Sequence, residues 1–296
     1  MSALSIAGAV LVMFLWAICF PLIRVGLDSS PPMVFAALRA LIAGSALLLI
    51  AQGLRRPSVA WRPVWTSVAL VGFTATSLGF FGMFFGARLI SPGLATVIAN
   101  MQPLIASVLA WAFLNEHLTG VQRLGLAIGF AGIVLIALPG FAGTGSHWQG
   151  LILILLGAVA IAISNVILKK LAGRVDIFRA MGWQLLIGAV PLGILAVTFE
   201  DLNAVVWSMQ FVVNLTVLSL VGTSAAFVLW FLLLRRARLT ELNVFSFLTP
   251  VFGLLMGALF FAEQLQFLEG AGVLLSLVGI YAVSFRRKRT DAGVIS

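Results

Sequence analysis

The chain has 296 residues, of which 62% are apolar and only 9% are charged. About a quarter of the residues of a water-soluble domain are charged, so this composition excludes a surface that faces water over most of the molecule. Cys19 is the single cysteine, which excludes an intrachain disulfide framework, and the net charge of +9 has to be interpreted from where the charges lie.

Ten apolar segments are long enough to cross a bilayer, for which a helix needs about 20 residues. Their ends are marked by Pro, Gly and charged residues, and several connections between them are short. The first segment is too long for a signal-peptide core, so we expect an uncleaved helix there. In chain order the predicted helices are residues 4–24, 32–53, 66–88, 93–114, 120–138, 148–170, 177–198, 210–234, 241–262 and 267–285.

The basic residues gather in alternate connections between these helices. With the N-terminus in the cytoplasm, fifteen of the 18 Lys and Arg residues lie on the cytoplasmic side. Loops that are rich in Lys and Arg stay in the cytoplasm. We therefore predict a multi-pass protein of the bacterial plasma (inner) membrane with cytoplasmic N- and C-termini. The positive charge then determines topology, and we expect no nucleic-acid partner.

The two halves of the chain are related by a shift of 147 residues, which places Pro103 on Pro250 and Glu116 on Glu263. Each half contains five helices, an odd number, so the halves enter the membrane in opposite directions. Many secondary transporters have such inverted repeats and bind substrate between them. We predict an all-α integral membrane protein with ten transmembrane helices, arranged as two inverted five-helix repeats. The first repeat is residues 1–140, the second is 148–285, and 286–296 form a basic cytoplasmic tail.

These features resemble the EamA-type transporters of the drug/metabolite transporter superfamily. The resemblance lies in the Pro-to-Glu segments at residues 95–133 and 242–280 and in residues 16–39, which include an arginine early in the second helix. It implies a ten-helix exporter or exchanger of amino acids and related small metabolites. One departure is that Gln184 stands roughly opposite Arg39, so the two repeats are functionally unequal.

Polar and aromatic side chains inside the spans are the candidates for substrate binding, because polar groups are costly in hydrocarbon and are often functional there. On the fourth predicted helix several of them share one helical face, and the ninth helix has an equivalent face. The hydroxyl groups could instead join neighbouring helices, and Trp16 could simply pack. The candidates are Trp16, Arg39, Ser77, Thr96, Asn100, Asn165, Thr223, Asn243 and Ser246.

Arg39 is the one charged residue deep within a predicted helix. At 1.5 Å per residue it lies about 12 Å from the start of its helix, close to the middle of a hydrocarbon core about 30 Å thick. The guanidinium could bind a substrate carboxylate, pair with carbonyl groups at a helix end, or reach outward to the interface. Binding a carboxylate would favour an anionic or zwitterionic substrate.

Prolines and glutamates of the predicted helices are candidates for moving parts. Pro21, Pro103 and Pro250 are predicted hinges, because each removes a backbone hydrogen bond. Glu116 and Glu263 end the fourth and ninth helices, where we expect them to cap a helix or to close a gate. Small residues on the fifth and tenth helices indicate either close helix packing or a homodimer contact.

Several kinds of chemistry have no matching residues in this sequence. No Asp or Glu lies in the middle of a predicted span, so a carrier coupled to protons through a buried carboxylate is not evident. There is no Walker A sequence, and the two His residues have no partners at metal-ligand spacing. We therefore predict that the protein is not an enzyme and uses neither a cofactor nor a metal.

The function predicted from these observations is secondary transport by alternating access. The protein would export amino acids, including aromatic or other apolar ones, and related small metabolites across the plasma membrane. Its partners would be a small-molecule substrate, the lipid bilayer and, as a homodimer, a second copy of the chain. Two alternatives stay open: broad-specificity efflux of drugs and metabolites, and a membrane sensor or assembly partner that transports nothing.

Overall fold

The computed structural model describes residues 1–57, 61–89, 99–138, 148–261 and 267–284. Within these ranges the chain is helical and contains no strand. An apolar chain in a bilayer has this architecture because each backbone N–H and C=O group has to be bonded inside the protein. The predicted all-α membrane fold is confirmed.

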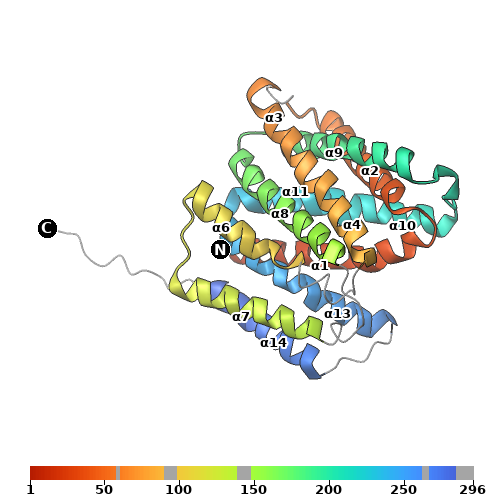
Figure 1. The fold of residues 1–296 in the computed structure, drawn as a ribbon. Coiled ribbons are helices and arrows are strands. Elements are labelled where there is room, and N and C mark those ends of the chain that lie inside the picture. Colours follow the sequence, from red (N-terminus) through yellow and green to blue (C-terminus); the bar gives the residue numbers. More distant parts are fainter. Residues whose placement is uncertain (58–60, 90–98, 139–147, 262–266, 285–296) are drawn as a thin grey trace.

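The helices form a bundle in which α7 and α14 lie side by side along one flank (Figure 1). The first half of the chain contains α1 (Ala3–Leu27), α2 (Pro32–Gly53), α3 (Trp61–Val71), η1 (Gly72–Leu78), α4 (Gly79–Leu89), α6 (Gln102–Leu114) and α7 (Gly120–Ala137). The second half contains α8 (Trp148–Leu171), α9 (Ile177–Phe199), η3 (Leu202–Ala204), α10 (Met209–Ser219), η4 (Leu220–Ala225), α11 (Ala226–Arg236), α12 (Leu239–Asn243), η5 (Val244–Phe247), α13 (Leu248–Phe261) and α14 (Phe267–Ser284).

These elements account for the ten predicted spans. The segments long and apolar enough to cross a membrane are Ala3–Leu27, Pro32–Gly53, Val64–Gly86, Ile152–Leu171, Ile177–Phe199 and Met209–Arg236. The shorter apolar helices Gln102–Leu114, Gly120–Leu135 and Gly270–Ala282, together with α13, occupy the other four positions. The third and eighth spans are composite, because each contains a π-helical segment, η1 or η4.

The fourth and ninth spans differ from the prediction, because neither is a continuous α-helix in its described part. The chain turns at Asn100 and Met101 before α6 begins, and the ninth span consists of α12, the 3-10 turn η5 and α13. Pro103 and Pro250 lie in the first turns of α6 and α13, where a missing N–H leaves no helical bond unmade. The helical face predicted for the fourth span therefore does not continue through the turn.

Helices from the two halves of the chain pack against one another in pairs. α2 packs along α9, α4 along α8, and α7 along α14. A Cβ atom added to Gly279 of α14 would lie 2.5 Å from the backbone nitrogen of Gly129, and one added to Gly132 of α7 would lie 2.6 Å from the carbonyl oxygen of Gly272. The small residues of the fifth and tenth spans therefore serve close packing within the chain, and a homodimer would need another surface.

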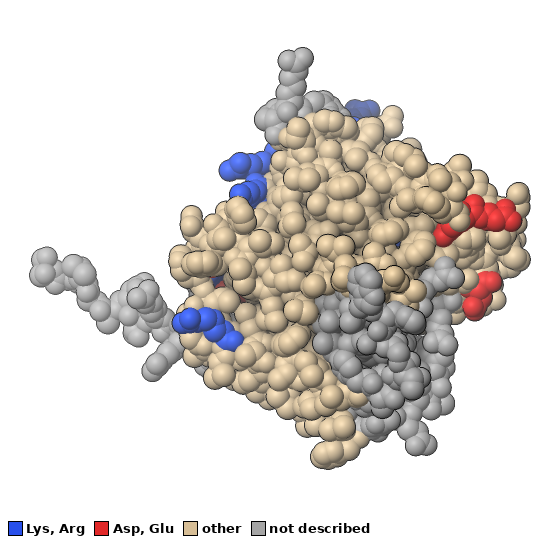
Figure 2. Space-filling model, in the orientation of Figure 1, with Lys and Arg blue, Asp and Glu red and all other residues tan. Residues whose placement is uncertain are grey.

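Lys and Arg side chains lie mainly at one end of the bundle, where Asp176 and Glu116 also lie. On the visible face, Lys and Arg lie toward the side of the N-terminus, whereas Asp and Glu lie at the opposite end (Figures 1 and 2). Such a separation is typical of a protein whose two ends face different membrane surfaces.

Candidate functional site

Arg39 lies in α2 with 5% of its surface exposed. Its Nε donates a hydrogen bond to Oγ1 of Thr223 at 2.7 Å, and its Nη2 lies 3.8 Å from Sγ of Cys19. The guanidinium carbon is 4.9 Å from the centre of the Phe80 ring, a distance at which a cation is attracted to an aromatic face. The structure thus brings α1, α2, α4 and η4 together around the buried positive charge of Arg39.

Two buried hydroxyl groups of η1 bind α9. Oγ1 of Thr76 donates a hydrogen bond to Oε1 of Gln184 at 3.0 Å, and Oγ of Ser77 donates to the carbonyl oxygen of Gly188 at 2.8 Å. Thr76 is 0% and Ser77 4% exposed. The predicted site residue Ser77 therefore joins two helices here, which was one of the alternatives for the hydroxyl groups.

The same pattern recurs between η4 and α2, with the roles of the two repeats exchanged. Thr223 accepts the hydrogen bond from Arg39 and donates its own to the carbonyl of Leu218 at 2.9 Å. Oγ of Ser224 lies 3.1 Å from the carbonyl oxygen of Ala43. The second helix of each repeat is thus bound, near mid-span, by a Thr-Ser pair on the third helix of the other repeat.

Each Thr-Ser pair lies in a π-helical segment at a corresponding place in its repeat. The hydroxyls of Thr223 and Ser224 both reach carbonyl groups five residues earlier in the chain, which is the hydrogen-bond step of a π-helix. π-Helical segments are rare and are often found at functional sites. The feature is therefore common to both repeats.

Asn165 of α8 makes a second buried polar contact. Its Oδ1 accepts a hydrogen bond from Nε1 of Trp230 at 3.0 Å. The Trp230 ring is 5.3 Å from that of Trp16 on α1, and Trp16 is 6.4 Å from Phe227 in an edge-to-face arrangement. Trp16, Phe227 and Trp230 are called the aromatic cluster below, and Asn165 holds one of its rings in place.

The predicted site residues of the fourth and ninth spans lie near the interrupted parts of those helices. Asn243 ends α12 and is 0% exposed, and neither its amide oxygen nor its amide nitrogen has a hydrogen-bond partner among the described residues. Ser246 is half-buried in η5, and Asn100 is half-buried at the turn before α6. Thr96 lies outside the described residues. An amide that is fully buried and unpaired among the described residues is costly, so Asn243 stays a predicted site residue.

Glu116 caps a helix of the opposite repeat. Its carboxylate accepts hydrogen bonds from the backbone nitrogens of Leu239 and Thr240, both at 3.0 Å, and from the Thr240 hydroxyl at 2.9 Å. A carboxylate is favourable there because the first turn of a helix carries unpaired N–H groups and a partial positive charge. A role in gating stays a prediction for Glu116. Glu263 lies outside the described residues.

The predicted hinge prolines have different surroundings. Pro21 lies inside the continuous helix α1, whereas Pro103 and Pro250 lie in first helical turns that follow a turn or a 3-10 segment. The two interrupted spans therefore already contain irregular backbone. Broken helices of this kind surround the substrate sites of many transporters.

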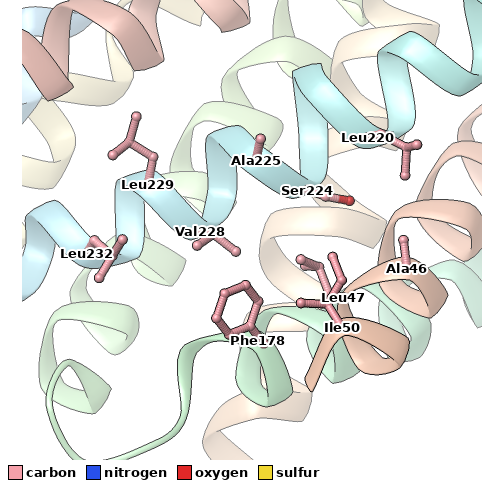
Figure 3. Close-up of a pocket in the computed structure, with 10 residues that line it drawn as sticks. All are labelled: Ala46, Leu47, Ile50, Phe178, Leu220, Ser224, Ala225, Val228, Leu229 and Leu232. Carbon is pink, nitrogen blue, oxygen red and sulfur yellow. The ribbon is translucent and has the colours of Figure 1, made fainter. Parts of the chain in front are cut away.

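A groove of about 420 Å³ lies between α2, α9 and the composite helix η4–α11 (Figure 3). Its lining is apolar apart from Ser224, whose hydroxyl is already bonded to Ala43 and Ser219. Ile50 and Leu220 at its wall are 45% and 39% exposed, so the groove opens to the outside of the bundle. It contains none of the predicted site residues. The lining residues are Ala46, Leu47, Ile50, Phe178, Leu220, Ser224, Ala225, Val228, Leu229 and Leu232.

Sequence reasoning did not assign Cys19 and Phe80 to the site, although both contact Arg39. One signal was available for Cys19, because it follows Trp16 by three residues and therefore lies close to the same helical face. Nothing in the local sequence indicates Phe80, which is one of 23 phenylalanines. Within the described part of the chain, no group of three or more His, Cys, Asp and Glu side chains could hold a metal ion.

Comparison with known protein families decides the identity of this arrangement. Residues 3–138 and 148–285 each match the EamA-like transporter family. The chain belongs to the EamA-like transporter family. The predicted resemblance is confirmed, and this EamA-like protein is a membrane transporter.

The EamA-like chain has bacterial relatives along almost its whole length. It is 31% identical over 286 residues to the uncharacterized transporter YvbV of Bacillus subtilis. The aligned region covers 95% of this chain and 92% of that protein. A probable amino-acid metabolite efflux pump of Escherichia coli is 27% identical over 92% of both chains. The protein of the same name in Salmonella typhimurium is 28% identical, over 95% of this chain and 96% of that one.

A crystal structure with 20% sequence identity superposes on the EamA-like chain with a TM-score of 0.83. The superposition covers 96% of this chain and 97% of the other. At this identity the likeness supports the fold alone.

Proposed function

We propose that this EamA-like transporter exports amino acids, including aromatic or other apolar ones, and related small metabolites by alternating access. The observation that carries the proposal is the mirrored pair of contacts, α2 with η4 and α9 with η1, by which each repeat binds the other near mid-span. Inverted repeats of this kind can exchange two equivalent arrangements, so that a central site opens first to one surface and then to the other.

The proposed substrate site lies between the spans that carry the buried polar groups. Asn243 has an amide without a described partner, and Asn100 and Ser246 lie at the interrupted parts of the fourth and ninth spans. The aromatic cluster, held by Asn165, supplies an apolar wall. Polar groups fix the orientation of a ligand while apolar surface supplies contact area, so an amino acid with an apolar side chain fits this combination.

The proposed location is the bacterial inner membrane, with both termini in the cytoplasm. This orientation is supported by the excess of Lys and Arg in the loops on the side of the termini. Export is the proposed direction because two relatives are named efflux pumps. Transport would involve no covalent chemistry, and a homodimer would form through a surface other than the small-residue faces of α7 and α14.

Purified protein in liposomes tests the proposal. The liposomes are loaded with a panel of labelled amino acids, and their release is compared with that from protein-free liposomes of the same lipids. We expect faster release of at least one apolar or aromatic amino acid, and imposed pH and sodium gradients identify the coupling ion. Release no faster than from protein-free liposomes for the whole panel would overturn the proposal.

The apolar groove of Figure 3 favours a second candidate function, the efflux of lipophilic compounds. A groove with only apolar free surface binds ligands through the hydrophobic effect and gives little selectivity among them. A lipophilic cation is therefore included in the same panel. Its transport without transport of any amino acid would favour this second function.

A further inference from the structure

The mirrored contacts at the centre of the bundle differ in charge. On one side the guanidinium of Arg39 donates a hydrogen bond to Thr223, with a distance of 2.7 Å between Nε and Oγ1. On the other side Thr76 donates to the neutral amide of Gln184, with a distance of 3.0 Å between the oxygens. A neutral side chain on α9 therefore makes the same kind of helix contact that the arginine makes on α2.

Helix packing alone does not account for the positive charge of Arg39. A charged side chain near the middle of a membrane is costly on every measured scale, and Gln184 makes the equivalent contact without that cost. The described neighbours of the guanidinium are neutral, namely the hydroxyl of Thr223, the thiol of Cys19 and the ring of Phe80. Among the described residues no Asp or Glu forms an ion pair with it. A buried guanidinium with neutral neighbours is suited to an anion that binds and leaves.

We propose that Arg39 binds the carboxylate of the transported molecule, an inference that rests on the transport function proposed above. A guanidinium can form two parallel hydrogen bonds with a carboxylate, and a Lys side chain cannot reproduce that geometry. In the present arrangement Nε and Nη2 face Thr223 and Cys19. Binding of a carboxylate exchanges these neutral partners for a charged one and releases Thr223 of η4 from α2.

The aromatic cluster determines the chemistry at the other end of the ligand. Trp16 lies one helical turn from Cys19 on α1. Trp230 lies seven residues after Thr223, which is about 10 Å along the helix axis. Both rings pack together, so a molecule whose carboxylate lies at Arg39 extends along α1 and α11 toward an aromatic wall. The ligand class is a carboxylic acid or zwitterion with an apolar or aromatic side chain.

Three related probes separate the contribution of the carboxylate. They are L-phenylalanine, 3-phenylpropionate, which lacks the amine, and phenethylamine, which lacks the carboxylate. The thermal unfolding midpoint of the full-length protein in detergent reports binding, and the flux of labelled L-phenylalanine into liposomes reports transport. For the wild type we expect the two carboxylates to raise the midpoint and phenethylamine to leave it unchanged.

Arg39→Gln removes the charge and keeps a side chain that already serves at the mirrored position. We expect its unfolding midpoint without ligand to equal that of the wild type. We expect the concentration of L-phenylalanine for half-maximal flux to rise about 10- to 100-fold, as for loss of a charged hydrogen bond. Should Arg39→Gln fail to fold, Arg39→Lys keeps the buried charge without the paired donors and is expected to raise this concentration several-fold.

Gln184→Leu is the matched control, because it removes the mirrored contact, in which Thr76 bonds Gln184, without changing a charge. We expect it to change the half-maximal concentration by less than about twofold. An equal rise in both variants would identify a general packing effect and overturn the proposal. If the wild type transports L-phenylalanine and Arg39→Gln has the same half-maximal concentration, the Arg39 site is overturned and the transport function is not.

The two readouts also separate this inference from the proposed function. Stabilisation by carboxylates that depends on Arg39, without any flux, would support the anion site and contradict transport of these molecules. If no carboxylate is transported and none stabilises the protein, both the anion site and the transport function are overturned.

Discussion

At the scale of single residues, buried polar side chains in this transporter mostly bind partners on other helices. Asn165 binds Trp230, Thr76 binds Gln184, and Arg39 binds Thr223. Hydrogen bonds between membrane helices contribute about 0.6 kcal/mol on average and at most about 1.7 kcal/mol in double-mutant cycles. Each bond is therefore a small part of the stability. Their combined effect is to select one relative placement of the helices.

The contact between Asn165 and Trp230 gives a prediction at this scale. Trp230→Phe and Asn165→Leu each leave one buried polar group unpaired, so each is expected to lower the free energy of unfolding by about 1–3 kcal/mol. The double variant should lose less than the sum, with a coupling energy of about 0.6–1.7 kcal/mol. Unfolding by a denaturing detergent measures these values.

Trp207→Phe is the control for the change of ring, because Trp207 is 62% exposed. We expect it to change the unfolding free energy by less than about 0.5 kcal/mol, as for most surface substitutions. If the losses of the two single variants sum to the loss of the double variant within about 0.3 kcal/mol, the hydrogen bond does not couple Asn165 and Trp230.

At the scale of elements, the ends of several helices are satisfied by the opposite repeat. Glu116 of the first repeat caps α12 of the second, and Glu200 of the second repeat accepts hydrogen bonds from the backbone nitrogens of Met33 and Val34 in α2. A helix start inside or near hydrocarbon needs such acceptors, because its first N–H groups have no partner within the helix. The two repeats therefore depend on each other for complete helices.

The contact of α7 with α14 gives a prediction for close helix packing. A methyl group at Gly279 would meet the backbone of Gly125 and Gly129 at 2.6 and 2.5 Å. Backbone cannot move aside as a flexible side chain can, so Gly279→Ala should force the helices apart. We expect a loss of stability of about 1–3 kcal/mol, measured as a lower thermal unfolding midpoint in detergent.

Gly270→Ala in the same helix is the matched control, because among the described residues no atom outside its own helical backbone and chain neighbours lies within 4 Å of a Cβ added there. Alanine favours a helix over glycine by about 1 kcal/mol, so its unfolding midpoint should stay the same or rise. Equal midpoints for Gly279→Ala and wild type would contradict the close packing of α7 and α14.

At the scale of the whole molecule, the inverted repeat and the separation of charge determine how the chain can sit in a membrane. Helices of one half pack against helices of the other in the pairs α2 with α9, α4 with α8 and α7 with α14. A rearrangement of one such set has a counterpart in the other, which is the structural requirement of alternating access. The charge separation in Figure 2 relates the two ends of the bundle to different surfaces.

The proposed orientation is testable with single cysteines at opposite ends of the bundle. Arg174 follows α8 and Asn203 lies in η3, and both are exposed. In intact cells, a membrane-impermeant maleimide should label Asn203→Cys, whereas Arg174→Cys should be labelled only after the cells are broken. The wild type measures the background from Cys19, which is 5% exposed. The reversed labelling pattern would place the termini outside the cell.

Most of the fold was predictable because its causes are local. An apolar run of about 20 residues has to be a helix in a bilayer, and a five-helix repeat that recurs has to be inverted. The interruptions at Asn100 and within η5 and the π-helical segments were not predictable, because hydrophobicity does not distinguish an α-helix from a π-helical or 3-10 turn.

The site was predictable only as a set of residue types at the right depth in the membrane. The sequence by itself determined that lipid is the solvent, that the chain forms inverted repeats, and that Arg39 and Asn165 need partners, because burial of polar groups in hydrocarbon is costly wherever they lie. Only the tertiary structure decided that the partners are Thr223, 184 residues along the chain from Arg39, and Trp230 for Asn165. The physical reason is that a hydrogen bond forms within about 3 Å, and the packing of whole helices determines which atoms come that close.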